Sequence, residues 1–485
     1  MQINSSDRLL ELVLRSLDGA IAPELQSPGA RGAVELIRST LGELRRRLGP
    51  SAELLARCIE SGEVLARELA AALGEALATP AEVGAHETFE SLSPRYSALT
   101  QRIDAACQRL AAQEHPQAAA LLRRAAEWEL GYYAGVQQLA PPPVSEMPQT
   151  APPLSAAFLQ DFLNEVRDAA NGPYRVAEFA PLPGGFGKQT YLCSVDDAKG
   201  AREELVVRKS DPAPIMSHGI FELEQEFALL RDLNASGYPA PRPLELASKR
   251  PGVDATFYTM PRLPGRVPGS FLGAHQQTFS EALLLRLAEL LAELHRVPLT
   301  RFANYFAQFE DAGALSETIE QRYRRNLRGW RAYVAGEPHL ASPYITWLFD
   351  WLEHHVPADS RAPVLTHGDF NVHNVLAEGD RIIAVLDWEC ADFGAPELDL
   401  AYIQPHVSKH IAWERFVARY REHGGPEIDS TRMPFCLAYS VLRTSLGGNR
   451  GTRNLQTGKN PDLRYVMAEL GFVPMFMQIA LDNAR

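Results

Sequence analysis

The chain has 485 residues, 46% of them hydrophobic and 22% charged, which is ordinary for a soluble globular protein with room for about three domains. Its formal net charge of −12 argues against nucleic acid or an anionic membrane as the main partner, because binding to phosphate-rich surfaces needs an excess of Lys and Arg. Five cysteines without paired spacing indicate neither a disulfide framework nor a zinc site, and no signal peptide or membrane-spanning run is visible, so we expect a cytoplasmic protein.

The first 138 residues are predicted to form a bundle of helices. Apolar side chains recur at helical spacing from Leu9 to Leu17 and, further along, in residues 34–48, 52–77, 96–112 and 121–139. Several amphipathic helices in succession favour an antiparallel bundle. This segment carries no catalytic constellation, and we expect residues 1–138 to fold as a separate unit that covers the remaining domain or mediates homo-oligomerisation.

A proline-rich segment separates this bundle from the rest of the chain. Residues 140–153 contain six prolines in fourteen positions, so they can form neither a helix nor a central strand. We predict a semi-rigid linker over residues 139–154.

The remaining chain divides into a strand-rich part and a helix-rich part. Short β-like runs at residues 189–195, 204–208 and 256–260 surround one predicted helix at 220–233. From residue 279 onward the pattern is helical, apart from three short strand-like pieces between 364 and 387. This order predicts an α+β fold with two lobes like that of a protein kinase. A β-rich N-lobe would occupy residues 155–265 and a helical C-lobe residues 266–485, preceded by the all-α bundle.

The motif that carries chemistry is His-Gly-Asp-Phe-Asn-Val-His-Asn at residues 367–374. His367, Asp369 and Asn374 reproduce the spacing of a kinase catalytic loop, in which an aspartate is followed by four residues and then an asparagine. The carboxylate of Asp369 can accept the proton of an attacking hydroxyl group, while the amide oxygen of Asn374 can bind a magnesium ion on the phosphates. In this catalytic group we assign His367 to bracing the loop backbone, and we interpret His373 as a variable position.

A hairpin follows the loop and supplies the second metal ligand. Residues 374–377 and 381–386 are predicted to pair about the turn Glu378-Gly-Asp380. The hairpin would place Asp387 beside Asn374. Two protein oxygens are sufficient for a Mg²⁺ ion that keeps phosphates and waters as its other ligands.

These residues resemble the aminoglycoside phosphotransferase and choline kinase family. The family signature, His-Gly-Asp-x-x-x-x-Asn followed by a strand that ends in Asp-Trp-Glu, stands here at residues 367–374 and 387–389. The family usually continues with Gly-Asp-Pro and Asp-Leu-Ala, whereas this chain has Gly394-Ala-Pro396 and Asp399-Leu-Ala401. The resemblance covers residues 155–430 and implies that Asp399 braces the catalytic loop. Similarity at residues 205–230 points to the kinase-like domains related to those fused to acyl-CoA dehydrogenases.

A glycine-rich turn is expected to lie over the phosphates of the nucleotide. Gly184, Gly185 and Gly187 fall within residues 182–190, and backbone N–H groups approach phosphate oxygens closely only where side chains are absent. The segment is no Walker A loop, because Leu182 stands at the first glycine position and Gln189 replaces the Ser or Thr. Glycine clusters are commonly plain turns. Only its position ahead of a strand at 205–209 favours a phosphate-binding role for this one.

A cation on that strand is expected to bind the α- and β-phosphates and to pair with a glutamate on a helix. Arg208 and Lys209 point to opposite faces of the strand, so only one of them can face the cleft; the family pattern favours Arg208, and Lys209 stays open. The predicted partner is Glu226, because it shares the helix face of Leu223 and Leu230, where an unpaired carboxylate would be costly.

The segment at residues 258–265 is interpreted as the hinge between the two lobes. It follows a strand-like run and contains two prolines and a glycine. We expect adenine to form hydrogen bonds with the backbone near Met260 and Arg262.

The motif and the resemblance together predict an ATP- and Mg²⁺-dependent kinase that phosphorylates a hydroxyl group of a small molecule. One alternative is a protein kinase, because residues 395–397 read Ala-Pro-Glu, a motif of that family. The other is a non-catalytic nucleotide-binding scaffold. Only seven residues separate Asp387 from Ala395, too few for an activation segment that holds a peptide. The sequence does not distinguish between several classes of acceptor: aminoglycosides, choline-like amines, sugars, hydroxyacyl-CoA and catabolic alcohols. Acidic residues within 301–359 fit a cationic acceptor and solvated helix faces equally well.

Overall fold

The structure is a computed structural model, and it describes residues 14, 17–22, 25, 28–47, 50–75, 87–113, 115–139, 154–182, 187–211, 214–250, 255–269, 279–311, 313–456 and 471–484. The chain divides into two compact units. Unit 1 comprises Met1–Pro148, Arg331–Val356 and Val441–Arg485, and unit 2 comprises Gln149–Trp330 and Pro357–Ser440. This division differs from the one expected from the sequence, because residues 331–356 and 441–485, assigned there to the C-lobe, join the N-terminal helices in unit 1.

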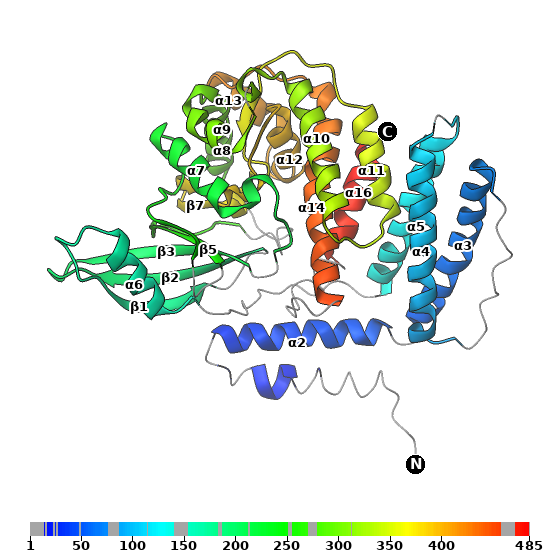
Figure 1. Ribbon diagram of the computed structural model, residues 1–485, viewed down its shortest axis with the longest axis horizontal. Helices are drawn as coiled ribbons and strands as arrows, with labels where there is room; N and C mark the ends of the chain where they lie inside the picture. Colours follow the sequence, from blue (N-terminus) through cyan, green and yellow to red (C-terminus); the bar gives the residue numbers. More distant parts are fainter. Residues whose placement is uncertain are drawn as a thin grey trace. The chain divides into compact units, whose positions relative to one another are not determined.

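Unit 1 is built from helices. A short π-helical turn, Leu17–Ile21, precedes α2 (Pro28–Arg47), α3 (Pro50–Ala72), α4 (Phe89–Ala111) and α5 (Ala118–Leu139). The later segments contribute α11 (Pro343–His354), the second half of α14 (Met433–Gln456) and α16 (Val473–Asn483). In Figure 1, α3, α4 and α5 run side by side, and α11 and α16 pack against α5. The predicted helices at 34–48, 52–77, 96–112 and 121–139 correspond to α2 to α5.

Buried carboxylates attach α11 to the N-terminal helices. Ser342 caps α11 by accepting the Ile345 N–H at 3.2 Å, and its own hydroxyl donates to Glu129 Oε2 at 3.0 Å. The same Glu129 oxygen accepts the Tyr344 N–H at 2.9 Å. Asp104 on α4 accepts a hydrogen bond from Thr346 Oγ1 at 2.6 Å. These bonds supply partners for the first turn of α11, whose backbone donors have none within the helix.

The buried Glu129 predicts an unusual pH dependence of stability. Burial raises the pKa of Glu129 to about 7, against an ordinary value of 4.5. The folded state therefore binds more protons than the unfolded state between pH 4.5 and about 7, and the free energy of unfolding falls as pH rises through this window. We expect Glu129→Gln, which keeps an oxygen for Ser342 and Tyr344, to stabilise the protein by about 3 kcal/mol at pH 8 and by nothing near pH 4.5.

Urea unfolding at a series of pH values measures this difference. Glu60→Gln is the matched control, because Glu60 lies on the exposed face of α3 and should give the same small change at every pH. If Glu129→Gln destabilises the protein equally at pH 5 and pH 8, the carboxylate is not protonated in the fold.

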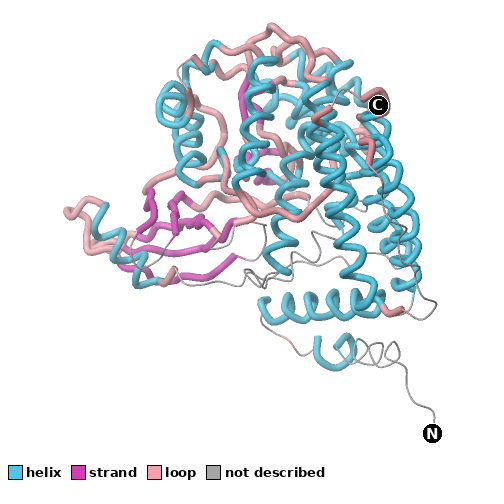
Figure 2. The backbone as a smooth tube through the Cα atoms, turned by 45° about the vertical axis from the view of Figure 1, so that its right-hand side comes forward, coloured by secondary structure: helices cyan, strands magenta, loops and turns pink. Residues whose placement is uncertain are grey.

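Unit 2 contains a five-stranded antiparallel sheet. Its strands are β1 (Arg175–Leu182), β2 (Lys188–Asp196), β3 (Arg202–Ser210), β4 (Leu246–Arg250) and β5 (Ala255–Pro261), in the order β1-β2-β3-β5-β4. The strands run next to one another in Figure 2, with one helix along the sheet. β2, β3 and β5 match the predicted strand-like runs, whereas β1 and β4 have no counterpart in the prediction.

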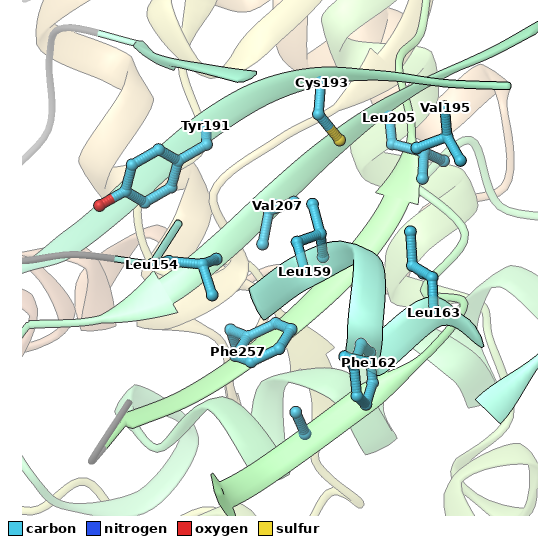
Figure 3. Close-up of a cluster of buried hydrophobic side chains, with 11 residues drawn as sticks. Leu154, Leu159, Phe162, Leu163, Tyr191, Cys193, Val195, Leu205, Val207 and Phe257 are labelled. Atoms are coloured by element: carbon cyan, nitrogen blue, oxygen red, sulfur yellow. The ribbon is translucent and has the colours of Figure 1, made fainter. Parts of the chain in front are cut away.

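One face of this sheet is covered by α6 (Ala156–Val166), a helix that was not predicted. Its side chains Leu159, Phe162 and Leu163 point toward the sheet and meet buried residues of β2, β3 and β5 (Figure 3). Along β3 the odd-numbered residues Leu205 and Val207 face α6, so the even-numbered residues must face the other side of the sheet. That opposite face carries Arg208.

The remaining elements of unit 2 are mainly helical. After a turn of 3₁₀ helix at Gly219–Phe221, α7 (Leu223–Ala235) lies on the Arg208 side of the sheet. The later helices are α8 (Glu281–His295), α9 (Ala303–Phe309), α10 (Ile319–Gly336, up to Trp330), α12 (Glu397–Val407), α13 (Trp413–Glu422) and the first half of α14, with 3₁₀ turns at Leu299–Phe302, Ala314–Ser316 and Ser430–Arg432.

Two small sheets interrupt the helices. β6 (Val364–Thr366) pairs with β9 (Asp392–Gly394), and β7 (Val375–Glu378) pairs with β8 (Arg381–Val385) as the predicted hairpin. The expected α+β fold, with a β-rich lobe, a helix-rich lobe and N-terminal helices, is confirmed. Among the described residues, no helix combines the length and the apolar character that a membrane span requires.

Candidate active site

The loop after β6 holds the predicted catalytic motif and is anchored by Asp399 on α12. The backbone N–H groups of His367 and Gly368 donate to the two Asp399 carboxylate oxygens at 2.8 and 2.7 Å. Gly368 has φ +76°, a left-handed conformation that glycine adopts without a steric penalty. His295 Nε2 lies 3.1 Å from Asp399 Oδ2. Asp399 thus makes the bracing contact that the family resemblance implied.

His367 is fully buried, and both of its ring nitrogens contact the backbone. Nε2 lies 2.7 Å from the Leu386 carbonyl oxygen, which can only accept, so Nε2 carries the proton and donates. Nδ1 is then free to accept the Asp369 N–H at 3.3 Å. A ring with both nitrogens in use positions the loop and transfers no proton, in agreement with the bracing role expected for His367.

Asp369 is held in one orientation by the asparagine five residues later. The Asn374 side-chain amide donates to the Asp369 carbonyl oxygen at 2.9 Å and to its carboxylate Oδ2 at 2.8 Å. The second carboxylate oxygen, Oδ1, lies 3.6 Å from His373 Nε2. Burial acts to raise the pKa of Asp369, but the neighbouring side chains of His373 and Tyr402 outweigh burial and lower the pKa to about 2. The carboxylate is therefore ionised at neutral pH.

His373 is a neighbour of Asp369 that the sequence interpretation did not include in the site. The sequence predicts only a variable position here, yet its Nε2 atom lies 3.6 Å from Oδ1 of Asp369, within ion-pair distance of that carboxylate. The spacing offered a signal, because Asp369 and His373 are four residues apart across the short 3₁₀ turn Val372–Asn374, where side chains at this separation can meet.

Asn374 and Asp387 lie together at the ends of the β7–β8 hairpin. The Leu386 N–H donates to the Asn374 carbonyl oxygen at 2.7 Å, which fixes the residue before Asp387 against the catalytic loop. Since the Asn374 NH₂ group faces Asp369, its Oδ1 atom remains as an acceptor. Asp387 adopts φ 62° and ψ 64°, a left-handed conformation that is uncommon for a residue with a side chain. Such backbone strain is concentrated at functional sites.

The cation of β3 that faces the site is Arg208. Its Nε lies 3.0 Å from Glu226 Oε1, and Tyr258 on the neighbouring strand donates to the same carboxylate at 3.0 Å. Glu226 is buried, as its place on the packed face of α7 predicted. Lys209 points to the opposite face of the sheet, where its Nζ donates to Gln189 Oε1 at 3.0 Å and burial lowers its pKa. Of the two cations considered, Arg208 alone reaches Glu226.

Arg208 also contacts the acidic residues after β8. Its Nη2 lies 2.7 Å from Asp387 Oδ1 and 2.9 Å from Glu389 Oε2. Burial opposes the charge of Arg208, but the three carboxylates raise its pKa well above the ordinary value. Burial and the neighbouring Asp387 raise the pKa of Glu389. One guanidinium therefore links the sheet, α7 and the proposed metal ligand Asp387, a role that suits its fixed array of five donors.

Of the residues predicted for the hinge and for the glycine-rich turn, those that the structure describes lie at the end of β5 and the start of β2. Met260 lies on the same face of β5 as Tyr258, next to the site. The prediction for Arg262 needs correction, because its backbone N–H donates to the Glu204 carbonyl oxygen at 2.9 Å and is not available to adenine. Gly187 has φ +84° and leads into β2, whereas Gly184 and Gly185 lie outside the described residues.

Comparison with known proteins identifies the group to which this arrangement belongs. A family model described as "Phosphotransferase enzyme family" matches residues 178–435, which is more than half of the chain. Curated relatives include acyl-CoA dehydrogenase family member 11 of Homo sapiens, 28% identical over 246 residues, which are 48% of this chain and 29% of that protein. Probable acyl-CoA dehydrogenase IBR3 of Arabidopsis thaliana is 24% identical over 271 residues, 54% of this chain and 31% of that protein. The chain thus spans about a quarter to a third of these relatives.

Solved structures with a similar fold include two antibiotic phosphotransferases. Macrolide 2′-phosphotransferase MphH from Brachybacterium faecium gives a TM-score of 0.41 at 21% identity and covers 66% of this chain and 98% of that chain. Spectinomycin phosphotransferase APH(9)-Ia, in complex with ADP and spectinomycin, gives 0.44 at 14% identity and covers 68% of this chain and 99% of that chain.

The expected resemblance, including the link to proteins of the acyl-CoA dehydrogenase family, is confirmed. The family match spans the second half of β1 to the start of α14, so it contains most of the β-rich lobe, the catalytic loop, the β7–β8 hairpin and α12. This chain belongs to the phosphotransferase enzyme family.

Proposed function

We propose that this protein transfers the γ-phosphoryl group of ATP, bound with Mg²⁺, to a hydroxyl group of a small molecule. The observation that carries the proposal is the ionised carboxylate of Asp369, oriented by the Asn374 amide at 2.8 Å in the same loop as a metal-ligand position. A carboxylate so fixed can accept a proton from an alcohol at the start of phosphoryl transfer.

The residues at the hairpin suit a magnesium ion. The donors are the Asn374 amide oxygen and the Asp387 carboxylate, and hard oxygen ligands are those that Mg²⁺ prefers. Asn374 turns its NH₂ group toward Asp369, which leaves its oxygen as a ligand, and the Asp387 side chain is partly exposed. When bound, the ion would neutralise charge on the phosphates of the nucleotide.

The chain's own residues account for the remaining steps. Asp369 would accept the hydroxyl proton as the acceptor oxygen forms a bond to the γ-phosphorus and the bond to the ADP oxygen breaks. His367 and Asp399 would keep the Asp369 backbone fixed during this step. Arg208, held by Glu226, would lie against the α- and β-phosphates, since it already reaches Asp387 from β3.

The backbone after β5 supports a place for adenine. Because the Arg262 N–H is directed at β3, the alternation of an antiparallel strand directs the next amide, that of Leu263, away from β3. We expect Leu263 N–H and the carbonyl of Pro261 to pair with the adenine edge. Met260 would then contribute its side chain to the pocket and not its backbone donor.

A small-molecule acceptor is favoured over a peptide by the segment after Asp387. It consists of the 3₁₀ turn Trp388–Cys390 followed at once by β9, which pairs residue by residue with β6: Val364 with Gly394, Leu365 with Phe393 and Thr366 with Asp392. A segment used in this way cannot also form the long platform on which protein kinases hold a peptide.

The first test measures release of ADP from Mg·ATP by the full chain over a broad panel of hydroxyl compounds. The second measures transfer of labelled phosphate to a proteome extract and, separately, to a metabolite extract. We expect saturable transfer to members of the small-molecule fraction. Labelling of specific proteins alone would indicate a protein kinase. Nucleotide binding without transfer to either fraction would support the non-catalytic scaffold.

A further inference from the structure

Helix α12 carries a line of side chains that leads away from the catalytic carboxylate. Asp399, Tyr402 and His406 are spaced by three and four residues, so they share one face of the helix. Asp399 holds the catalytic loop, and Tyr402 is among the side chains that lower the pKa of Asp369. His406 follows one turn further along, at the end of the helix. Its place on this face puts it on the side of α12 that faces the catalytic loop, and His373 of that loop acts on its pKa.

His406 belongs to a small cluster with His410 and Phe279. The two imidazole rings have centroids 5.5 Å apart, and the Phe279 ring lies 5.4 Å from His406 and 5.1 Å from His410. The Nε2 atoms of both histidines are buried, and neither has a hydrogen-bond partner among the described residues. Buried polar atoms without partners are rare in folded proteins and are commonly completed by a ligand or by water.

The titratable side chains that act on His406 are all basic. Burial, together with the charges of His410, His373 and Lys409, lowers the pKa of His406 to about 4. Each of these neighbours is basic, and they come from two elements, the catalytic loop and the segment after α12. A negatively charged group beside His406 would favour the protonated form of its ring, whereas a cation would disfavour that form further.

Three of the acidic residues that made a cationic acceptor plausible form ion pairs with arginines of α10. Glu310 pairs with Arg322 and Arg325 at 2.6 Å each, Glu317 pairs with Arg325 at 2.8 Å, and Glu320 pairs with Arg324 at 3.0 Å. These ion pairs neutralise the carboxylates within α10 and the segment before it, so they do not provide a free negative surface for an amine.

We propose that His406 and His410 form a subsite that binds an anionic group of the acceptor, a carboxylate or a phosphate, while the hydroxyl group of the same molecule lies at Asp369. This inference rests on the proposed function, because it names the class of acceptor for that site. One to two helical turns separate Tyr402 from the two histidines, so the hydroxyl and the anion would lie about 5–11 Å apart. The acceptor is thus a compact hydroxy acid or hydroxyalkyl phosphate.

A matched series of six-carbon acceptors tests the charge class. It consists of ω-hydroxyhexanoate, hexanediol monophosphate, the neutral methyl ester of the acid, and the amino alcohol of the same length. We expect kcat/KM for at least one anionic member to exceed those of the ester and the amine by about tenfold or more, equivalent to about 1.4 kcal/mol. The ratio between the two anions distinguishes a carboxylate site from a phosphate site.

Variants test whether the two histidines are responsible. The His406→Ala/His410→Ala double variant should lose the preference for the anion, mainly through a higher KM, while its thermal unfolding midpoint shows whether it is folded. His423→Ala is the matched control, since His423 lies at the end of α13, 3.6 Å from Glu289, and it should retain the preference. Equal turnover of the amine, or an anion preference that persists in the double variant, overturns the proposal.

A binding measurement separates this proposal from the proposed function. In the full chain with isotope-labelled histidine, the signals assigned to His406 and His410 should move on titration with ω-hydroxyhexanoate or hexanediol monophosphate, and not with the ester or the amine. Movement without ADP release would contradict the proposed function and support the anion site. ADP release without any movement of these histidine signals for either anion would support the proposed function and contradict the anion site.

Discussion

Replacement of Asp369 by Asn should lower kcat by about 10²- to 10⁴-fold while the affinity for Mg·ATP changes little. An amide has nearly the same shape as the carboxylate but cannot accept the hydroxyl proton. The structure also shows why the change should leave the loop in place. The Asp369 carbonyl still accepts the Asn374 amide, and Asp399 holds the loop through the backbone of His367 and Gly368.

The measurement is steady-state ADP release together with direct titration of nucleotide binding. Asp161→Asn, on the exposed face of α6, is the matched control and should behave as the wild type. Turnover by Asp369→Asn within about threefold of the wild type would remove this residue from the role of base. Loss of nucleotide binding in the same variant would show that the change had disturbed the loop and not only the proton transfer.

The parts of the site that could be predicted from the sequence are those set by local spacing. The interval from Asp369 to Asn374 and the hairpin that ends at Asp387 depend on short-range geometry, which one stretch of sequence contains. The pairing of Glu226 could be predicted for a related reason, because the apolar stripe of α7 shows which face is buried. A buried carboxylate then requires a cation.

The parts that could not be predicted depend on contacts between distant segments. The N-terminal helices share a compact unit with α11 and α16, because Glu129 binds the first turn of α11 and Arg123 donates to carbonyl oxygens at the end of α16, both more than 200 residues further along. Their own apolar periodicity shows that a face is buried, but it cannot name the partner that buries it. The edge strands β1 and β4 were missed for the same reason, since their pattern is set by the neighbouring strand and by α6.

The hinge shows a finer limit. The prolines and the glycine predict a hinge after β5, but which amide is directed away from β3 depends on the register of β3 against β5. Leu205 pairs with Pro261, and this register directs the Arg262 N–H at Glu204. A shift by one residue would have exchanged the two edges of the strand.

Replacement of Asp387 by Ala should abolish Mg·ATP-dependent turnover, with a loss of about 10³-fold or more. Phosphoryl transfer depends mainly on positioning and on neutralising charge, so removal of the only carboxylate in the proposed metal-ligand pair should be more damaging than removal of the amide. Asn374→Ala should cause a smaller loss and raise the Mg²⁺ concentration needed for half-maximal turnover. It also frees Asp369 Oδ2, so part of its effect should appear in kcat.

The Asp387 variant also separates the two roles of this residue, as the proposed metal ligand and as a partner of Arg208. Asp387 accepts Nη2 of Arg208 at 2.7 Å, but that guanidinium keeps Glu226 and Glu389 as partners when Asp387 is removed. The fold should therefore survive, with an unfolding midpoint near that of the wild type, while a titration with Mg²⁺ at fixed ATP should show no activation. If the Mg²⁺ dependence of Asp387→Ala matched that of the wild type, the ion would be held elsewhere, and Glu389, the other carboxylate on Arg208, would be the next residue to replace.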